Sequence, residues 1–401
     1  MEISALAMYR PAWVDTRGRR TVGPDEDVST LAVSAGRLLD GRLADVTRVV
    51  LVTRRPDALL GTAPEVLLEG LGLAPATPVV EQVGGAPATV EALLAATAGT
   101  LVLAVDPIAP AAAAAALVGP GPLTLDRPAT SRHSVPVRTI PLPGAADLVY
   151  DDPRLLRERG WKRAAQEVAG EGARPLAVAG LPAAIAAKLG HDVSPGNGAL
   201  PGIAETEAAA PLLLLARAAA DGQEIRLVAV ENGHAVAVDV AISGPVPVLV
   251  AERSAHPAPA TWEPAAAAEI PASPAAYERA FEAKVGLKAG VCTCGERHYP
   301  PRAQCVACGA LDAQHLEPLP RAASIYSVVT VRAPVPGKTV PYSLAVVDLE
   351  GTGIRALVHV TDDPPGKAPI GAPGRLVLRR IAMRAGVPDY GYAFQPEEQQ
   401  A

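Results

Sequence analysis

All four cysteines of this chain lie between residues 292 and 308, and none occurs in the first 291 residues. A secreted disulfide framework would spread its cysteines over the fold, whereas a tight cluster is typical of a metal site. The 401 residues exceed what a single core usually contains, so we expect two or three domains. The cluster therefore predicts a small metal-stabilised module near the C-terminus, and the rest of the chain must be stabilised by apolar packing.

The spacing within VCTCGERHYPPRAQCVACG (291–309) divides the cysteines into two pairs, Cys292 with Cys294 and Cys305 with Cys308. A glycine follows each pair and lets the backbone amides fold back toward the thiolates in a knuckle turn. Tetrahedral zinc is the natural occupant of such a site. Because four thiolates fill its coordination shell, we expect the zinc to be structural and not to activate water.

Two alternatives remain open for this ribbon. The first pair has C-x-C spacing in place of C-x-x-C, so His298 could substitute for one of its cysteines as a ligand. The ribbon could also lack metal and carry free thiols. Both alternatives leave the module in the same part of the chain.

Composition excludes several classes of function. Hydrophobic residues make up 49% of the chain and aromatic residues only 3%, so the cores must be aliphatic. The formal net charge is -6 and no lysine- or arginine-rich run occurs, which argues against nucleic acid or an anionic membrane as the partner. The N-terminus lacks a basic head followed by an apolar core, and no stretch approaches 18 uninterrupted apolar residues. We therefore expect a soluble, cytoplasmic protein without a membrane partner.

Residues 1–252 alternate apolar strand-like runs with alanine- and leucine-rich helical stretches, which predicts an α/β layer architecture. The order repeats within this region. Strands at 47–53 and 99–106 enclose two helical stretches, and strands at 174–180 and 225–232 enclose two more. Duplicated halves would produce this pattern, although chance similarity in an alanine-rich chain is the alternative.

Four regions follow from these patterns. We expect an α/β domain at 1–252, a proline- and alanine-rich linker at 253–274, a helix with the zinc ribbon at 275–320, and a small all-β barrel at 321–401. The barrel is indicated by apolar runs at 324–331, 342–349, 354–360 and 375–383, which are separated by turn sequences.

The last third resembles the zinc-ribbon and OB-fold proteins called the domain of unknown function thirty-five family. The matching segments are PAAYERAFEAKVGL, CTCGERHYPPRAQCVACG, IYSVVTV, PYSLAVVDLEGTG and the closing FQP at Phe394. The resemblance implies a rubredoxin-like ribbon and an OB-fold that handle acyl-CoA. It also implies a subunit bound to a thiolase-fold enzyme, where the OB-fold helps to bind or channel the CoA thioester.

The first 250 residues resemble the thiolase superfamily, in particular its 3-hydroxy-3-methylglutaryl-CoA synthase branch. The matching segments are ISALAMYRPAW, PDEDVSTLAVSA, GGAPATVEALLAA and NGALPGIAETEAAAPLLLLARAAADGQEIRLVAVENG. The resemblance implies duplicated halves in an α/β/α/β/α layering. Working members use a cysteine at the start of a buried helix as the nucleophile. This chain has Gly84, Gly85 and Ala86 there, and the nearest hydroxyl is Thr89.

Other polar residues have simpler interpretations. His133, His191 and His234 fit loop or capping positions better than a general base, because none has a recognisable nucleophile beside it. The acidic run Asp25 to Asp27 fits the cap of a helix that begins at Ser29.

For the phosphates of CoA, the candidate cations are Arg302, Arg332 and Lys338, with Arg379, Arg380 and Arg384 as further options. For any one of them, a solvent-facing charge on a strand or loop is the simpler interpretation.

Three functions are compatible with these patterns. The first is a non-catalytic accessory subunit that binds a CoA thioester and either a thiolase-fold enzyme or a second copy of itself. The second is an acyltransferase or aldolase without a cysteine nucleophile, which would use Thr89 or a histidine. The third is a single-stranded nucleic-acid-binding protein, because zinc ribbons and OB-folds often bind nucleic acid. Its weakness is a poor stacking surface, since the four apolar runs that indicate the barrel carry only Tyr326 and Tyr342 as aromatic residues.

Overall fold

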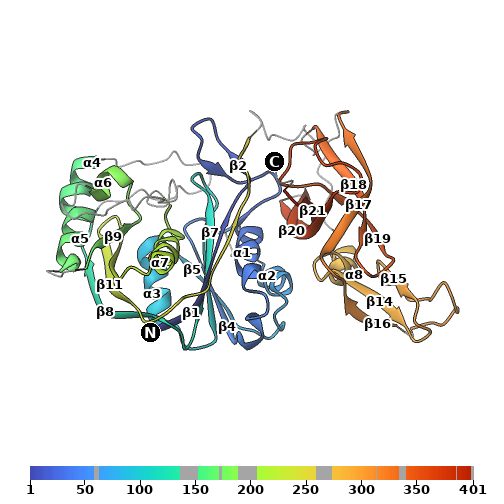
Figure 1. Ribbon diagram of the computed structural model, residues 1–401, viewed down its shortest axis with the longest axis horizontal. Helices are drawn as coiled ribbons and strands as arrows, with labels where there is room; N and C mark the ends of the chain where they lie inside the picture. Colours follow the sequence, from blue (N-terminus) through green and yellow to red (C-terminus); the bar gives the residue numbers. More distant parts are fainter. Residues whose placement is uncertain are drawn as a thin grey trace. The chain divides into compact units, whose positions relative to one another are not determined.

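The computed structural model describes residues 1–57, 63–135, 152–170, 174–187, 206–258, 273–312, 314–333, 340–384 and 386–398 (Figure 1). The chain forms two compact units. The first contains Met1–Arg10, Ala35–Thr62 and Ala76–Ala251, and the second contains Pro11–Ser34, Ala63–Pro75 and Glu252–Ala401. The second unit thus includes two segments from the N-terminal part of the chain. Among the described residues, no helix is long and apolar enough to cross a membrane.

The first unit is built on a ten-stranded sheet with the order β5-β4-β6-β7-β1-β8-β11-β10-β9, and β12 pairs with β1. The strands are β1 (Glu2–Arg10), β4 (Arg48–Thr53), β5 (Val79–Val83), β6 (Thr100–Asp106), β7 (Ala112–Val118), β8 (Leu123–Arg132), β9 (Leu176–Ala179), β10 (Ile225–Glu231), β11 (His234–Ile242) and β12 (Val248–Glu252).

The two halves of this sheet have the same topology. In the first half, β4 is parallel to β6, β6 is antiparallel to β7, and β7 is antiparallel to β1. In the second half, β9 is parallel to β10, β10 is antiparallel to β11, and β11 is antiparallel to β8. A helix directly precedes the second strand of each series: α3 (Ala86–Ala95) before β6 and α7 (Ala210–Asp221) before β10. The expected duplication is therefore confirmed.

Helices α3 and α7 lie side by side between the two halves of the sheet (Figure 1). The core around them is aliphatic, as expected, and combines residues of both helices with inward residues of both half-sheets. On the opposite face of the second half, α5 (Lys162–Ala169) packs on β8, β10 and β11. Further helical segments in this unit are η1 (Arg37–Leu39), η2 (Leu43–Asp45), α4 (Pro153–Leu155), η3 (Leu156–Trp161) and α6 (Ala183–Ala187). Sheet and helix layers thus alternate in this unit, as the α/β architecture predicted from the sequence requires.

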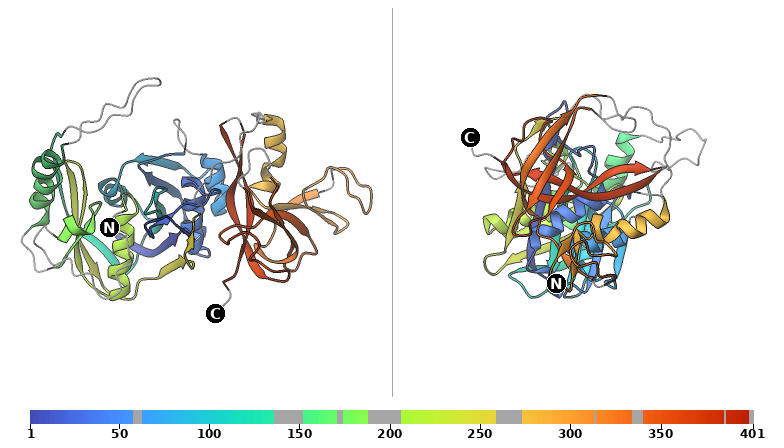
Figure 2. Two further views of the ribbon diagram at one scale, coloured as in Figure 1. Left: turned by 90° about the horizontal axis from the view of Figure 1, so that it is seen from above. Right: turned by 90° about the vertical axis from the view of Figure 1, so that its right-hand side faces the viewer.

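The second unit contains a five-stranded sheet with the order β19-β18-β17-β20-β21. Its strands are β17 (Ala322–Val331), β18 (Tyr342–Leu349), β19 (Arg355–His359), β20 (Pro373–Arg384) and β21 (Val387–Pro396). A parallel bridge between Val360 and Phe394 joins the two ends of the sheet. The strands curve around a common interior, which includes the fully buried ring of Phe394 (Figure 2). This closure confirms the OB-fold.

The zinc-ribbon region has its own small sheet with the order β15-β14-β16, formed by β14 (Lys288–Cys292), β15 (Arg297–His298) and β16 (Gln314–Pro318). Helix α8 (Pro274–Lys284) precedes it and starts at a proline, as its sequence predicts. A third sheet joins β2 (Trp13–Val14), β3 (Arg20–Thr21) and β13 (His256–Pro257). The unit is completed by α2 (Pro64–Leu71) and most of α1 (Val28–Gly36).

Candidate functional site

The four cysteine sulfurs form a compact cluster in the ribbon, and all lie within 4.8 Å of one another. The two distances that connect the pairs, Cys292 Sγ to Cys308 Sγ and Cys294 Sγ to Cys305 Sγ, are both 3.7 Å. A tetrahedral zinc with Zn–S bonds of about 2.3 Å places its sulfurs about 3.8 Å apart. The cysteines therefore fit a structural zinc site.

The backbone around the two cysteine pairs explains how C-x-C spacing can still supply two ligands. In the second knuckle, the Gly309 amide donates to the Cys305 carbonyl, four residues back, and in the first the Gly295 amide donates to the Cys292 carbonyl, three residues back. In both knuckles, the glycine after the second cysteine thus donates to the carbonyl of the first cysteine, and the turn at Cys292 closes with one residue fewer. Both glycines have positive φ, +90° at Gly295 and +74° at Gly309, which other residues adopt only with strain.

His298 lies beside the cluster and does not replace a cysteine in it. Its Nε2 is 3.4 Å from Cys305 Sγ, a hydrogen-bonding distance to sulfur. The Cys308 backbone amide and then this imidazole lower the pKa of the Cys305 thiol to about 6. Stabilised thiolates are the form that zinc binds.

The start of α3, where the thiolase resemblance places a nucleophile, contains an internal carboxylate (Glu231) from the other half of the unit. The Gly85 amide donates to Glu231 Oε2 over 2.8 Å, and Glu231 Oε1 accepts from Arg54 Nε over 2.8 Å. Arg54 also binds Glu207 at 2.9 Å. A Cβ on Gly85 would lie 2.8 Å from the Glu231 carboxylate, so a larger residue would require this carboxylate to shift. An ion-paired anion therefore occupies the positive end of this helix.

The start of α7 is capped in the same way from the opposite half. Both oxygens of Asp106, the last residue of β6, accept 2.9 Å hydrogen bonds from three successive amides, those of Glu207, Ala208 and Ala209. Burial raises the pKa of Asp106 to about 6, although these amides oppose the shift. Glu231 is likewise the last residue of β10. The last residue of the equivalent strand in each half thus caps the central helix of the other half. A small open pocket lined by Arg54, Asp106 and Glu207 lies at this point.

Thr89 is fully buried within α3, and its hydroxyl donates to the Ala208 carbonyl over 2.7 Å. The hydroxyl thus connects the two central helices. Because this hydroxyl donates to a backbone carbonyl, and no imidazole among the described residues contacts it, the geometry does not resemble an activated nucleophile.

Two of the three histidines singled out in the sequence lie against carboxylates, and His191 lies outside the described residues. His133 Nε2 is 2.8 Å from Glu167 Oε2 and 3.2 Å from Ser131 Oγ. Because one ring nitrogen faces both groups, the trio lacks the relay of a catalytic triad, which uses both nitrogens. His234 Nε2 lies 3.2 Å from Glu91, and burial lowers its pKa.

The proposed phosphate-binding cations have different environments. Arg302 and Arg332 are exposed, and Lys338 lies outside the described residues. Arg379 is fully buried among carboxylates, so the prediction that it could bind a phosphate of CoA was wrong. Arg384 forms a 3.0 Å ion pair with Asp389, and Arg380 lies 3.8 Å from Asp27.

The acidic run before α1 caps that helix one residue earlier than expected. The helix begins at Val28, and Asp27 Oδ1 accepts from the Thr30 amide over 3.0 Å. The Thr30 hydroxyl in turn accepts a 2.8 Å hydrogen bond from the Asp27 amide, and the two bonds together form a reciprocal capping box. The neighbouring Asp25 and Glu26 take part in the buried arginine cluster.

Comparison with known proteins supports the C-terminal assignment. Residues 316–379 match the family model described as the ChsH2 C-terminal OB-fold domain. A search of curated proteins finds no match. The C-terminal region is therefore of the ChsH2 type, in agreement with its strand order.

Several solved structures are also similar. AbyA1, a tetronic acid condensing enzyme, is 23% identical, with 61% of this chain and 100% of that chain covered and a TM-score of 0.47. The HMG synthase of the curacin biosynthetic pathway is 16% identical over 60% of this chain and 80% of that one, with a TM-score of 0.47. The Ltp2-ChsH2(DUF35) aldolase is 24% identical over 30% of this chain and 90% of that chain, with a TM-score of 0.25.

Proposed function

We propose that this chain is an accessory subunit of an acyl-CoA-processing complex, without covalent acyl-transfer activity of its own. The observation that carries the proposal is the Glu231 carboxylate bound to the Gly85 amide at the start of α3. A nucleophilic thiolate is stabilised at a helix N-terminus by its positive field. Here that field already stabilises an internal anion, and the chain has no cysteine before Cys292.

The C-terminal module supports a role in handling the thioester. A ChsH2-type OB-fold follows a ribbon whose four cysteines fit structural zinc. We propose that Arg302, Arg332 and Lys338 bind the phosphates of CoA. Of these, Arg302 and Arg332 have exposed side chains, as a phosphate ligand requires.

The first unit offers an edge for a partner with the same kind of fold. Strand β5 is the last strand on one side of the ten-stranded sheet. Its Val80 and Val83 are 38% and 69% exposed. An unpaired strand edge with apolar side chains is a template for pairing with another chain. We propose that a thiolase-fold enzyme subunit, or a second copy of this chain, pairs there.

Native mass spectrometry of the protein purified gently from its own host tests this function. We expect one zinc per chain and a stoichiometric companion that carries an active cysteine. Val83→Lys should release the companion, because it places a charge on the edge. Val250→Lys is the matched control, since Val250 is 52% exposed on β12.

Other outcomes would contradict the proposal. A protein that purifies alone and cleaves or condenses acyl-CoA would be an independent enzyme. A covalent acyl adduct seen by intact-mass measurement and lost in Thr89→Ala would identify a non-cysteine nucleophile. Salt-dependent binding of a single-stranded oligonucleotide would favour the nucleic-acid function.

A further inference from the structure

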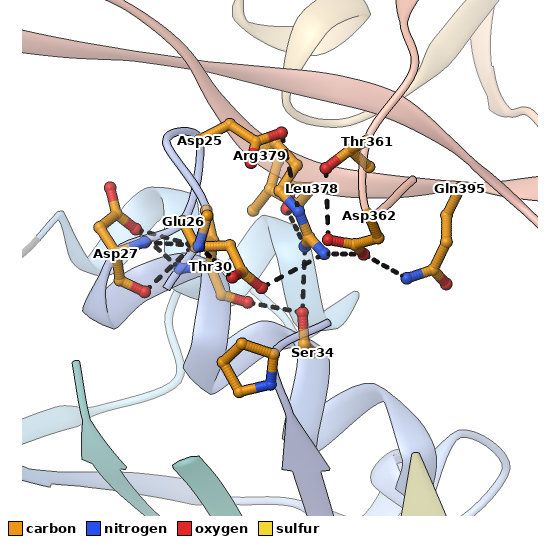
Figure 3. A network of polar contacts seen from close by, with 12 residues as sticks. Asp25, Glu26, Asp27, Thr30, Ser34, Thr361, Asp362, Leu378, Arg379 and Gln395 are labelled. Atoms are coloured by element: carbon orange, nitrogen blue, oxygen red, sulfur yellow. Dashed lines mark hydrogen bonds and ion pairs between the residues drawn. The ribbon is translucent and has the colours of Figure 1, made fainter. Parts of the chain in front are cut away.

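A buried cluster of charges surrounds Arg379 on β20 (Figure 3). Its guanidinium lies 2.7 Å from Asp362, 3.5 Å from Glu26 and 4.0 Å from Asp25. The side chains of Arg379, Glu26 and Asp362 are completely inaccessible to solvent. Charges so deeply buried are stable only when they are compensated, so the cluster must act as a unit.

The members of the cluster come from distant parts of the sequence. Asp362 follows β19 in the barrel and accepts a hydrogen bond from Gln395 of β21. Asp25 and Glu26 belong to the segment Pro11–Ser34, whose neighbours in sequence on both sides belong to the first unit. The cluster therefore attaches this segment to the barrel.

The attachment continues along the backbone of β20. The Arg380 amide donates to the Asp25 carbonyl over 2.9 Å, and the Arg380 side chain donates to the Pro24 carbonyl over 3.2 Å. Within the segment, the Gly23 amide donates to Glu26 Oε2 over 2.8 Å, which holds the Glu26 carboxyl toward the cluster.

The cluster places three carboxyls around one guanidinium. Burial is the main cause that raises the pKa of Glu26, to about 7, and the negative Asp362 and Asp25 add to it while Arg379 opposes it. Burial likewise raises the pKa of Asp25. The other charged groups that face this region are Asp27 with Arg380, and Asp363 with Arg253, His256 and Lys367.

We propose that the Arg379 cluster is a proton-linked lock that holds the segment Pro11–Ser34 on the OB-fold barrel. With a proton on Glu26, the carboxyls around the guanidinium carry one negative charge fewer and the lock is closed. When Glu26 loses the proton, the added buried negative charge is repelled by the other carboxyls of the cluster, and the segment detaches more often.

The direction of the pH effect follows from proton linkage. An acid whose pKa is higher in the closed state binds more protons there than in the open state. The closed state is therefore favoured at low pH and loses stability as pH rises from the ordinary pKa of 4.5 to about 7. For these two values, the opening equilibrium constant increases about tenfold from pH 6 to pH 8.

Hydrogen exchange on the full-length protein measures this opening directly. Peptides that cover residues 23–34 should lose about tenfold protection from pH 6 to pH 8, after correction for the intrinsic exchange rate. Glu26→Gln, which imitates the protonated acid, should keep these peptides protected at both pH values. Glu350→Gln, in an exposed turn, is the matched control and should behave as the wild type does.

A second variant separates the lock from a general loss of stability. Asp362→Asn removes one of the negative charges that raise the pKa of Glu26, so the midpoint of the pH dependence should move to lower pH. Protection that does not vary with pH in the wild type would overturn the proposal. An unchanged pH dependence in Glu26→Gln would also overturn it.

Discussion

The ribbon and the start of α3 are two places where resemblance leads one to expect reactive or metal-binding sulfur, and they differ completely. In the ribbon, four cysteines stand at the spacing of a zinc shell, although one pair is a residue shorter than usual. At the start of α3, the sulfur is absent and the Glu231 carboxylate lies against the helix. The α/β architecture of the first unit thus forms without a cysteine at this helix start, because packing and topology do not depend on one.

The largest effect should come from the ribbon. Cys305→Ser removes one of four zinc ligands, and structural zinc contributes on the order of 10 kcal/mol to the folding of such modules. We expect zinc content to fall from one per chain to near zero and β14 to β16 to lose protection from hydrogen exchange. Zinc retained at full stoichiometry would show that another group, with His298 the first candidate, completes the shell.

Arg379→Met should have the next largest effect, because it leaves Asp25, Glu26 and Asp362 buried without their shared cation. Removing one partner of a buried ion pair typically costs about 3–5 kcal/mol. Chemical denaturation measures the loss. Arg380→Met is the control, since its side chain is 28% exposed and it should cost about 1 kcal/mol or less. Equal losses would mean that the cluster contributes nothing beyond packing.

The Asp106 cap predicts a pH effect in the first unit. Its pKa is raised to about 6 in the folded protein, so the native state holds a proton that the unfolded state releases. Stability of the first unit should fall by about 3 kcal/mol as pH rises from about 4 to about 6 and then stay constant. Thermal unfolding across this range tests it, and Asp106→Asn should flatten the profile. A wild-type profile that rises there contradicts the prediction.

The smallest effect concerns Thr89. Thr89→Val keeps the shape of the side chain but removes the 2.7 Å hydrogen bond to the Ala208 carbonyl. The loss of stability should be about 1 kcal/mol. Any acyl-CoA turnover measured for the assembled complex should be unchanged. A loss of turnover without a larger loss of stability would indicate that Thr89 is a nucleophile, and the start of α3 would then be reactive after all.

Local patterns in the sequence predict the barrel, the metal ligands and the duplicated halves. The barrel follows from apolar runs between turn sequences, the metal ligands from the spacing of the cysteines, and the duplication from the repeated order of strand-like and helical stretches. Strand β7 shows where such patterns fail. Its sequence AAAAALV has high intrinsic helix propensity, yet it forms a fully paired strand between β6 and β1. Pairing with the strands on both sides there outweighs the helix propensity of the alanines.

The polar contacts were the least predictable part of the candidate site. The sequence shows an acid at the end of LVLAVD and another at the end of LVAVE, but only the topology places each acid on the helix of the other half. Arg379 is similar, since nothing in RLVLRRIAM distinguishes the buried arginine from its exposed neighbour. Contacts between residues hundreds of positions apart leave no local signature.

The exchanged caps also affect how this chain folds during synthesis. The carboxylate that binds the start of α3 is made 146 residues after its partner amide. At about 5–20 residues per second, the ribosome needs roughly 7–30 seconds to produce it. During that interval α3 lacks this cap, and a helix cap typically contributes about 1 kcal/mol. The central helix of the first half is therefore less stable until the second half has been synthesised.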